Sequence, residues 1–88
     1  MNDWFKERLE MRGLRREVFV DYFISIGGMR VEWDQFHGNG WKVRIDEEYE
    51  IRLGSITLPV VPITFGGVKD TALPLLHSFR MHFLSAGG

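Results

Sequence analysis

Residues 17–36, EVFVDYFISIGGMRVEWDQF, decide how the chain is expected to fold. Over 17–26 the side chains alternate between an apolar side and a mixed side, and this period of two is typical of a strand. Gly27–Gly28 predicts a two-residue hairpin turn into a second strand over 29–36. That turn places Tyr22 opposite Trp33, so apolar residues meet across the two strands.

The turns that follow extend the same sheet. A loop at 37–39 and another at 46–48 predict two further hairpins, and Gly54–Ser55 suits a tight turn with glycine first. Pro59 and Pro62 are expected at an edge of the sheet, where a missing N–H is tolerated. The result is a five-stranded antiparallel meander, with strands at roughly 17–26, 29–36, 41–45, 49–53 and 56–61.

A helix is predicted on each side of this sheet. Over 2–13, Phe5 and Leu9 lie four apart on one helical face, and Gly13 is a candidate C-terminal cap. In the second helix Thr71 is the expected cap and Pro74 falls in the first turn. One face of that helix carries apolar residues at helical spacing: Ala72, Leu76, Phe79 and Phe83.

An alternation over 78–84 leaves a sixth strand as the alternative to the second helix, and the helix is favoured. The predicted fold class is therefore α+β: a single domain, residues 1–88, with a five-stranded antiparallel meander and an N-terminal and a C-terminal helix packed on one face.

Composition narrows the possible functions. The 88 residues hold 11 Lys+Arg against 12 Asp+Glu, and residues 17–50 hold eight acids against three bases, so no nucleic-acid partner is expected. The absence of cysteine excludes disulfides, thiolate metal sites and a cysteine nucleophile. Without a signal peptide or a membrane-spanning run, the protein is expected to be cytoplasmic and to have no membrane partner.

On the other face of the predicted sheet, three phenylalanines stand among charged residues. Exposed aromatic clusters usually mark an interface, so Phe19, Phe23 and Phe36 are the candidate interface of a non-catalytic binding module. A homodimer or another protein partner would cover them. A further element of the same chain covering that face is the alternative. No enzyme activity and no cofactor are expected.

A candidate polar site lies on the same predicted face. Asp21 is placed opposite Asp34, and paired carboxylates can serve acid–base chemistry or hold a divalent cation unless Lys42 or Arg44 neutralises them. Glu32 and His37 are the other candidate polar residues, and together with Asp34 they could form a loose His–carboxylate metal site. No metal ligand is assigned.

The sequence closes with Ser85–Ala86–Gly87–Gly88. This di-glycine resembles the tail of the ubiquitin-like, MoaD-like sulfur-carrier proteins of molybdopterin and thiamin synthesis. The resemblance implies that the Gly88 carboxylate is adenylated and converted to a thiocarboxylate, and that Gly87 helps thread the tail into a narrow channel. Those proteins begin with a β-hairpin followed by a helix, which departs from the helix-first order predicted above. If 78–84 is helical, Gly87 is instead a helix cap.

Overall fold

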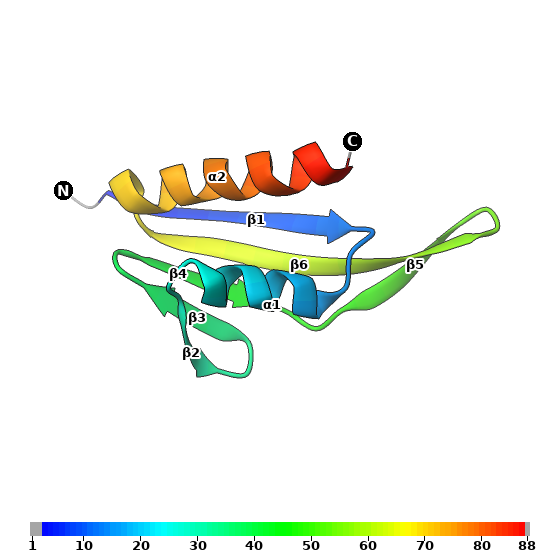
Figure 1. Ribbon diagram of the computed structural model, residues 1–88, viewed down its shortest axis with the longest axis horizontal. Helices are drawn as coiled ribbons and strands as arrows, with labels where there is room; N and C mark the ends of the chain where they lie inside the picture. The colour runs from blue at the N-terminus through cyan, green and yellow to red at the C-terminus, as the bar shows by residue number, and fades with distance from the viewer. Residues whose placement is uncertain (1–2, 88) are drawn as a thin grey trace.

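The computed structural model describes residues 3–87, and side chains as far as Leu84. The chain forms antiparallel strands and two helices, with one helix after the first strand and the other after the last (Figure 1). In chain order the elements are β1 (Trp4–Arg12), α1 (Arg16–Ser25), β2 (Met29–Glu32), β3 (Gln35–Gly38), β4 (Trp41–Ile45), β5 (Tyr49–Leu53), β6 (Ile56–Val68) and α2 (Lys69–Gly87).

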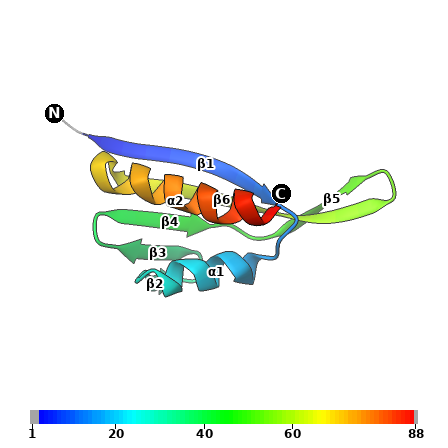
Figure 2. The ribbon, with the colours of Figure 1, turned by 45° about the horizontal axis from the view of Figure 1, so that its top comes forward.

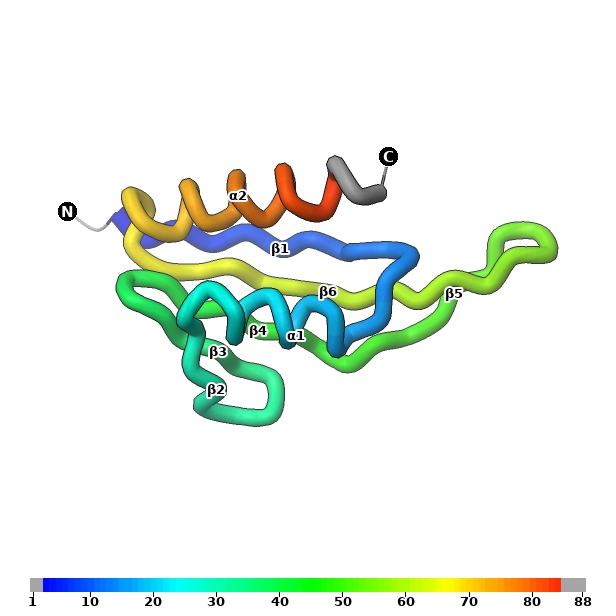
Figure 3. The backbone as a smooth tube through the Cα atoms, in the orientation of Figure 1, coloured from blue at the N-terminus to red at the C-terminus, as the bar shows by residue number. Residues whose placement is uncertain are grey.

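The long strand β6 organises the sheet (Figure 2). Six strands, all paired antiparallel, run in the order β1-β6-β4-β3-β2, and β5 pairs with β6 outside that path. Along β6, β5 pairs with residues 56–60 and β4 with residues 63–67. The β5–β6 hairpin therefore projects beyond both helices and lengthens the molecule to 49 Å (Figure 3).

The predicted five-stranded meander is wrong, because β4 and β5 do not pair with each other. Both pair with β6, so the expected contact between Ile45 and Tyr49 is not formed. The predicted last strand continues to Val68 and is central rather than an edge. Pro62 lies within it, at the point where β6 changes partner from β5 to β4.

The first 26 residues hold a strand and a helix in the opposite order to the prediction. The expected helix over 2–13 is β1, in which every second residue from Phe5 to Met11 is half-buried. Glu7 falls on that half-buried side, where its carboxylate binds Arg80 of α2 at 2.9 Å. Because Arg80 pairs with it, the charged Glu7 can lie between the apolar residues Phe5 and Leu9. The apolar alternation typical of a strand is therefore interrupted in the sequence.

The expected strand over 17–26 is the helix α1. Its buried residues are Phe19, Val20 and Phe23, which share one face of a helix. Val18 and Ile24 are exposed. The alternation that suggested a strand therefore reflects the β-branched residues in this segment and does not mark a buried side. Packing of the phenylalanines overrides that local preference.

Gly27–Gly28 ends α1 rather than forming a hairpin. Gly27 adopts φ +97°, and its N–H donates to the carbonyl of Ile24 at 3.1 Å. The N–H of Gly28 donates to the carbonyl of Phe23 at 2.8 Å. These two bonds form the Schellman arrangement, in which a glycine at positive φ closes a helix.

The predicted strand over 29–36 is two strands joined by a turn at residues 33–34. The next turn is Asn39–Gly40 rather than a loop at 37–39, which places Gly38 opposite Trp41 and Gln35 opposite Arg44. These shorter turns change the predicted register of every pair in this part of the sheet.

Two strands, a hairpin and a helix farther along the chain are confirmed. The strands over 41–45 and 49–53 have the expected bounds. The hairpin at Gly54–Ser55 sets Leu53 opposite Ile56, with Gly54 at φ +63°. Residues 78–84 are helical, as favoured, and α2 begins at Lys69, so Pro74 lies inside the helix rather than in its first turn.

Aromatic side chains form the centre of the hydrophobic core. Phe23 of α1 stacks on Phe79 of α2, with ring centroids 5.5 Å apart and an interplanar angle of 10°. The expected apolar face of α2 is confirmed, since all four of its predicted members are buried. The strands complete the core with Phe36, Val43, Ile45, Val61, Ile63 and Phe65.

Candidate functional site

Helix α2 ends at Gly87, the first residue of the di-glycine, and the core holds the helix in place. Phe79 and Phe83 pack on Phe19 of α1, with ring centroids 5.9 and 5.0 Å away. On the β1 side, Arg80 Nη2 donates to Glu7 Oε2 at 2.9 Å. Each attachment lies in the part of α2 before residue 84, and the helix continues to Gly87.

The last side chain that the structure shows buried is Phe83, which is 7% exposed, whereas Leu84 is 65% exposed. The core therefore fixes α2 up to Phe83. The candidate carrier residue Gly88 lies outside the described residues, and Gly87 is the last residue of the helix. The strand alternative for 78–84 is wrong, so the tail leaves a helix and not the sheet.

The candidate interface residues are in the core. Phe19, Phe23 and Phe36 are all 0% exposed, so the expected aromatic interface is wrong. The physical reason is the exchange of elements described above. Once 17–26 is a helix, Phe19 and Phe23 face inward together, and the shortened turn at Asn39–Gly40 turns Phe36 to the core opposite Val43.

The four candidate polar residues are not brought together as a site. Asp21 lies exposed on α1 and does not face Asp34. Asp34 binds Arg44 at 3.2 Å, so the cation proposed to neutralise it does so. Glu32 and His37 are exposed on β2 and β3, and within residues 3–87 no group of three His, Asp or Glu side chains is placed to hold a metal ion.

Between the two helices, the Tyr22 ring lies among aromatic rings, including the imidazole of His82 at a centroid distance of 5.0 Å. The Tyr22 ring packs within about 6 Å of three phenylalanines, Phe23, Phe79 and Phe83, at centroid distances of 5.2, 5.6 and 5.2 Å. Burial disfavours the charged phenolate and raises the pKa of Tyr22. The ring of Tyr22 therefore packs between the two helices.

The sequence matches one family along nearly its whole length. The family described as archaeal MoaD-like protein matches residues 7–88, from the middle of β1 through the di-glycine. The chain belongs to the archaeal MoaD-like family. This membership confirms the resemblance seen in the sequence. A search of curated proteins returns no match.

The order of helices and strands can now be compared with that expected for sulfur-carrier proteins. In this MoaD-like chain the matched span begins in a strand that leads into a helix, so the helix-first order that set the chain apart is removed. Two departures remain in the described residues: one strand rather than a hairpin precedes α1, and the last described residue, Gly87, belongs to a helix. No helix of the described chain, residues 3–87, is long and apolar enough to cross a membrane.

Proposed function

We propose that this protein is a sulfur carrier that acts through the Gly88 carboxylate. The observation that supports the proposal is the family match, which extends through Gly87 and Gly88. A carboxylate oxygen of Gly88 attacks the α-phosphorus of ATP and pyrophosphate leaves. Hydrosulfide then attacks the carbonyl carbon of the acyl adenylate, and AMP leaves. The product is a thiocarboxylate, and no oxidant or reductant is consumed.

The glycines suit this chemistry because they carry no side chain. A tail without side chains can enter a narrow channel in an activating enzyme and bring its carboxylate to ATP. Residues 84–88 follow the last buried side chain, Phe83, and five residues reach at most about 17 Å when extended. That length lets the tail enter such a channel while Phe83 remains in the core.

For the tail to enter such a channel in extended form, the last turn of α2 must unwind. Gly87 is the last residue of α2, and helix ends fray, so the turn that contains it opens easily. The bond between Arg80 and Glu7 and the packing of Phe83 lie before this turn and are kept. Unwinding therefore costs local helix energy and leaves the core intact.

The test uses ATP, sulfide and a MoaD-type activating enzyme, followed by intact-mass measurement. We expect the wild-type chain to gain the mass difference between sulfur and oxygen. A variant without Gly87 and Gly88 is expected to gain nothing. Met81→Ala is the matched control, because Met81 lies on the same helix and is 69% exposed. No gain in the wild type, or an equal gain in the shortened chain, refutes the proposal.

We further propose that two copies associate through the α1–β2 surface, which replaces the aromatic face as the site of the expected homodimer. Strand β2 is the last strand of the sheet order, so one of its edges lacks a neighbour within the described chain. Unpaired edges with apolar side chains favour pairing between chains. The exposed apolar residues of this surface are Ile24, Ile26, Met29, Val31 and Trp33.

Sedimentation distinguishes this proposal from the carrier function. We expect Met29→Asp together with Val31→Asp to convert a dimer to a monomer, because the buried carboxylates would lack partners. Leu53→Asp is the control on the distant β5 strand, where the side chain is 51% exposed. A wild-type monomer, or a double variant that remains dimeric, rules out the α1–β2 surface.

A further inference from the structure

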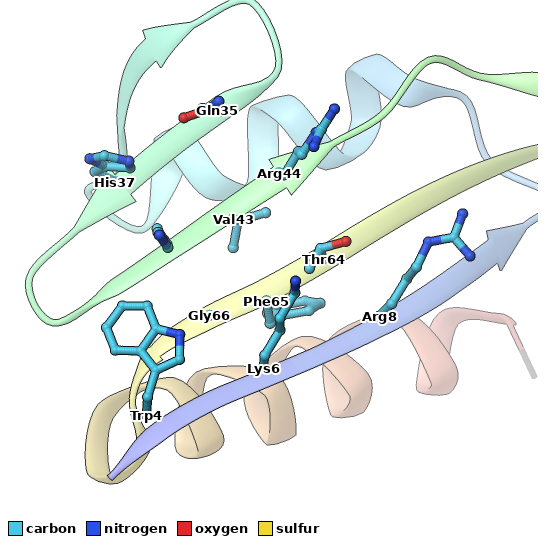
Figure 4. Close-up of a pocket in the computed structure, with 11 residues that line it drawn as sticks. Trp4, Lys6, Arg8, Gln35, His37, Val43, Arg44, Thr64, Phe65 and Gly66 are labelled. Carbon is cyan, nitrogen blue, oxygen red and sulfur yellow. The ribbon is translucent and has the colours of Figure 1, made fainter. Parts of the chain in front are cut away.

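The sheet face that points away from the core carries basic side chains in two rows (Figure 4). Lys6 of β1 and Lys42 of β4 both pair in register with Gly66 of β6. Arg8 and Arg44 likewise flank Thr64, two positions along β6. Because neighbouring strands are about 4.8 Å apart, the two cations of each row stand on strands about 10 Å apart.

Glycine at the centre of the first row leaves a hollow between the lysines. The hollow has a volume of about 400 Å³ and is lined by both rows and by Trp4. A Cβ at Gly66 would meet the methylene carbons of Lys42 at 3.6 Å, in the space that the hollow now occupies. Gly66 therefore forms the floor of a small site whose two walls are positive.

Positive charge is not spread evenly over this site. Arg8 binds Glu10 at 2.9 Å, and Arg44 binds Asp34 and Asp46 at 3.2 and 3.0 Å, so the arginine row is largely neutralised.

Lys6 and Lys42 form no ion pair with any residue in the described part of the chain. An anion is thus attracted to the lysine row. A long polyanion that continued past Arg8 and Arg44 would meet their carboxylate partners, so the site favours a short anion.

A second hollow of about 240 Å³ adjoins the first and shares Trp4, His37 and Lys42 with it. Its lining also includes three glycines, Gly38, Gly40 and Gly67, which contribute no side chain to it. Trp4 is 50% exposed, and the Lys42 ammonium lies 5.0 Å from its ring centroid. An exposed indole beside an open, side-chain-poor hollow suits a planar aromatic group.

We propose that this face binds a nucleoside phosphate. The phosphates lie between Lys6 and Lys42, and the base lies against Trp4 in the adjoining hollow. Ammonium groups bind phosphate oxygens through short charge-assisted bonds, and a base stacks on an aromatic ring with little regard to its identity. The first hollow, of about 400 Å³, falls in the range of small-molecule sites, and the second, of about 240 Å³, extends it. This site is independent of the Gly88 chemistry and requires no activating enzyme.

Calorimetric titration with ADP tests the proposal on the unmodified chain. We expect saturable binding that weakens between low and high salt, because exposed charges are screened. Lys6→Gln and Lys42→Gln are each expected to weaken binding at least about tenfold, the loss of a bond to a charged group. Trp4→Ala is expected to weaken ADP binding about tenfold and to leave pyrophosphate binding unchanged.

Two further variants separate charge from shape. Gly66→Ala narrows the floor without removing a charge, and we expect weaker ADP binding. Arg52→Gln removes a cation from the distant strand β5, and we expect ADP binding to stay as in the wild type. Circular dichroism confirms that each variant is folded before its affinity is compared.

Several results would overturn the site. They are an absence of saturable ADP binding, equal affinity in the lysine variants, and equal affinity for pyrophosphate and ADP. Equal affinity for adenosine and ADP would show that the lysine row does not hold phosphate. Tighter binding of an oligothymidylate than of ADP would assign the face to a nucleic-acid strand and refute the mononucleotide.

Discussion

Glu48 caps helix α1 from a distant part of the chain. Its Oε1 accepts a hydrogen bond of 2.8 Å from the backbone N–H of Arg16, and its Oε2 binds Arg15 at 2.9 Å. Arg15, the residue at the cap position, makes no side-chain cap bond of its own. A carboxylate at a helix N-terminus satisfies an unpaired N–H and complements the positive end of the helix dipole.

Glu48→Ala is therefore expected to lower the free energy of unfolding by about 1–2 kcal/mol, the usual cost of losing a helix cap. Urea denaturation measures the change. Glu50→Ala is the control, because Glu50 is an exposed acid on β5 in the same region. Equal stability of the two variants would show that the bond from Arg16 to Glu48 contributes nothing measurable.

Arg16 joins α1 to the two loops below it. Its guanidinium donates to the carbonyls of Trp33, Ile45 and Asp46 at 3.1, 2.7 and 3.1 Å, and lies 3.9 Å from the centroid of the Trp33 ring. Burial lowers the pKa of Arg16, and the group remains charged at neutral pH. A planar fork with five N–H donors can reach three carbonyls at once.

Arg16→Lys keeps the charge and loses the fork. We expect the free energy of unfolding to fall by about 2 kcal/mol. A lysine ammonium cannot reach the carbonyls of Trp33, Ile45 and Asp46 together, so at least one carbonyl loses its charged donor. Arg52→Lys, on the exposed β5 strand, is expected to change stability by less than about 0.5 kcal/mol. Equal melting temperatures for Arg16→Lys and the wild type would contradict the role of the fork.

The sequence predicted those elements whose signals are local. Gly54 needs a positive φ in its turn, and the strands on either side have matching apolar faces, so that hairpin and its register followed directly. The spacing of Ala72, Leu76, Phe79 and Phe83 predicted the buried face of α2 for the same reason. Each prediction depended on residues close together in the chain.

Two of the failures involve partners distant in sequence. Glu7 breaks the apolar alternation of β1 because it binds Arg80, and α1 is capped by Glu48 rather than by its own residues. Gly27 serves equally well in a hairpin or at the end of a helix, so its identity could not distinguish the two. The lysine row was missed because Lys6 was placed on a helix, and only the pairing of Gly66 with both lysines brings them together.

Burial of Tyr22 makes stability depend on pH in the alkaline range. Its pKa in the folded protein lies above the ordinary value of about 10, so the folded state holds the phenol proton more tightly than the unfolded chain does. The stabilisation is complete below pH 10 and is lost as pH rises through the folded pKa. We expect this decline in denaturation midpoints measured from pH 9 upward.

Tyr22→Phe removes the titrating group and keeps the ring that packs on Phe23, Phe79 and Phe83. The variant is expected to lose the part of the alkaline decline that belongs to Tyr22. Identical profiles for the variant and the wild type would show that another group causes the decline.

Two strand glycines differ in what surrounds them, so alanine is expected to cost much more stability at one than at the other. A Cβ at Gly38 would overlap the indole of Trp41, whereas a Cβ at Gly66 would make ordinary contacts at 3.6 Å. Neither glycine has a positive φ, so backbone strain does not contribute. We expect Gly38→Ala to cost about 2–3 kcal/mol by overpacking and Gly66→Ala to cost less than about 1 kcal/mol.

A double-mutant cycle shows whether the indole is the cause. If Trp41 is the obstacle, Gly38→Ala is expected to cost far less stability in a Trp41→Ala background. The effects of substitutions at two residues in direct contact do not simply add. Thermal melts of the four chains give the coupling. Additive costs would show that Trp41 does not cause the strain of Gly38→Ala. A large cost for Gly66→Ala would mean that the Lys42 side chain cannot move away from the new methyl group. In that case Gly66→Ala could not be used to test ADP binding at the lysine row.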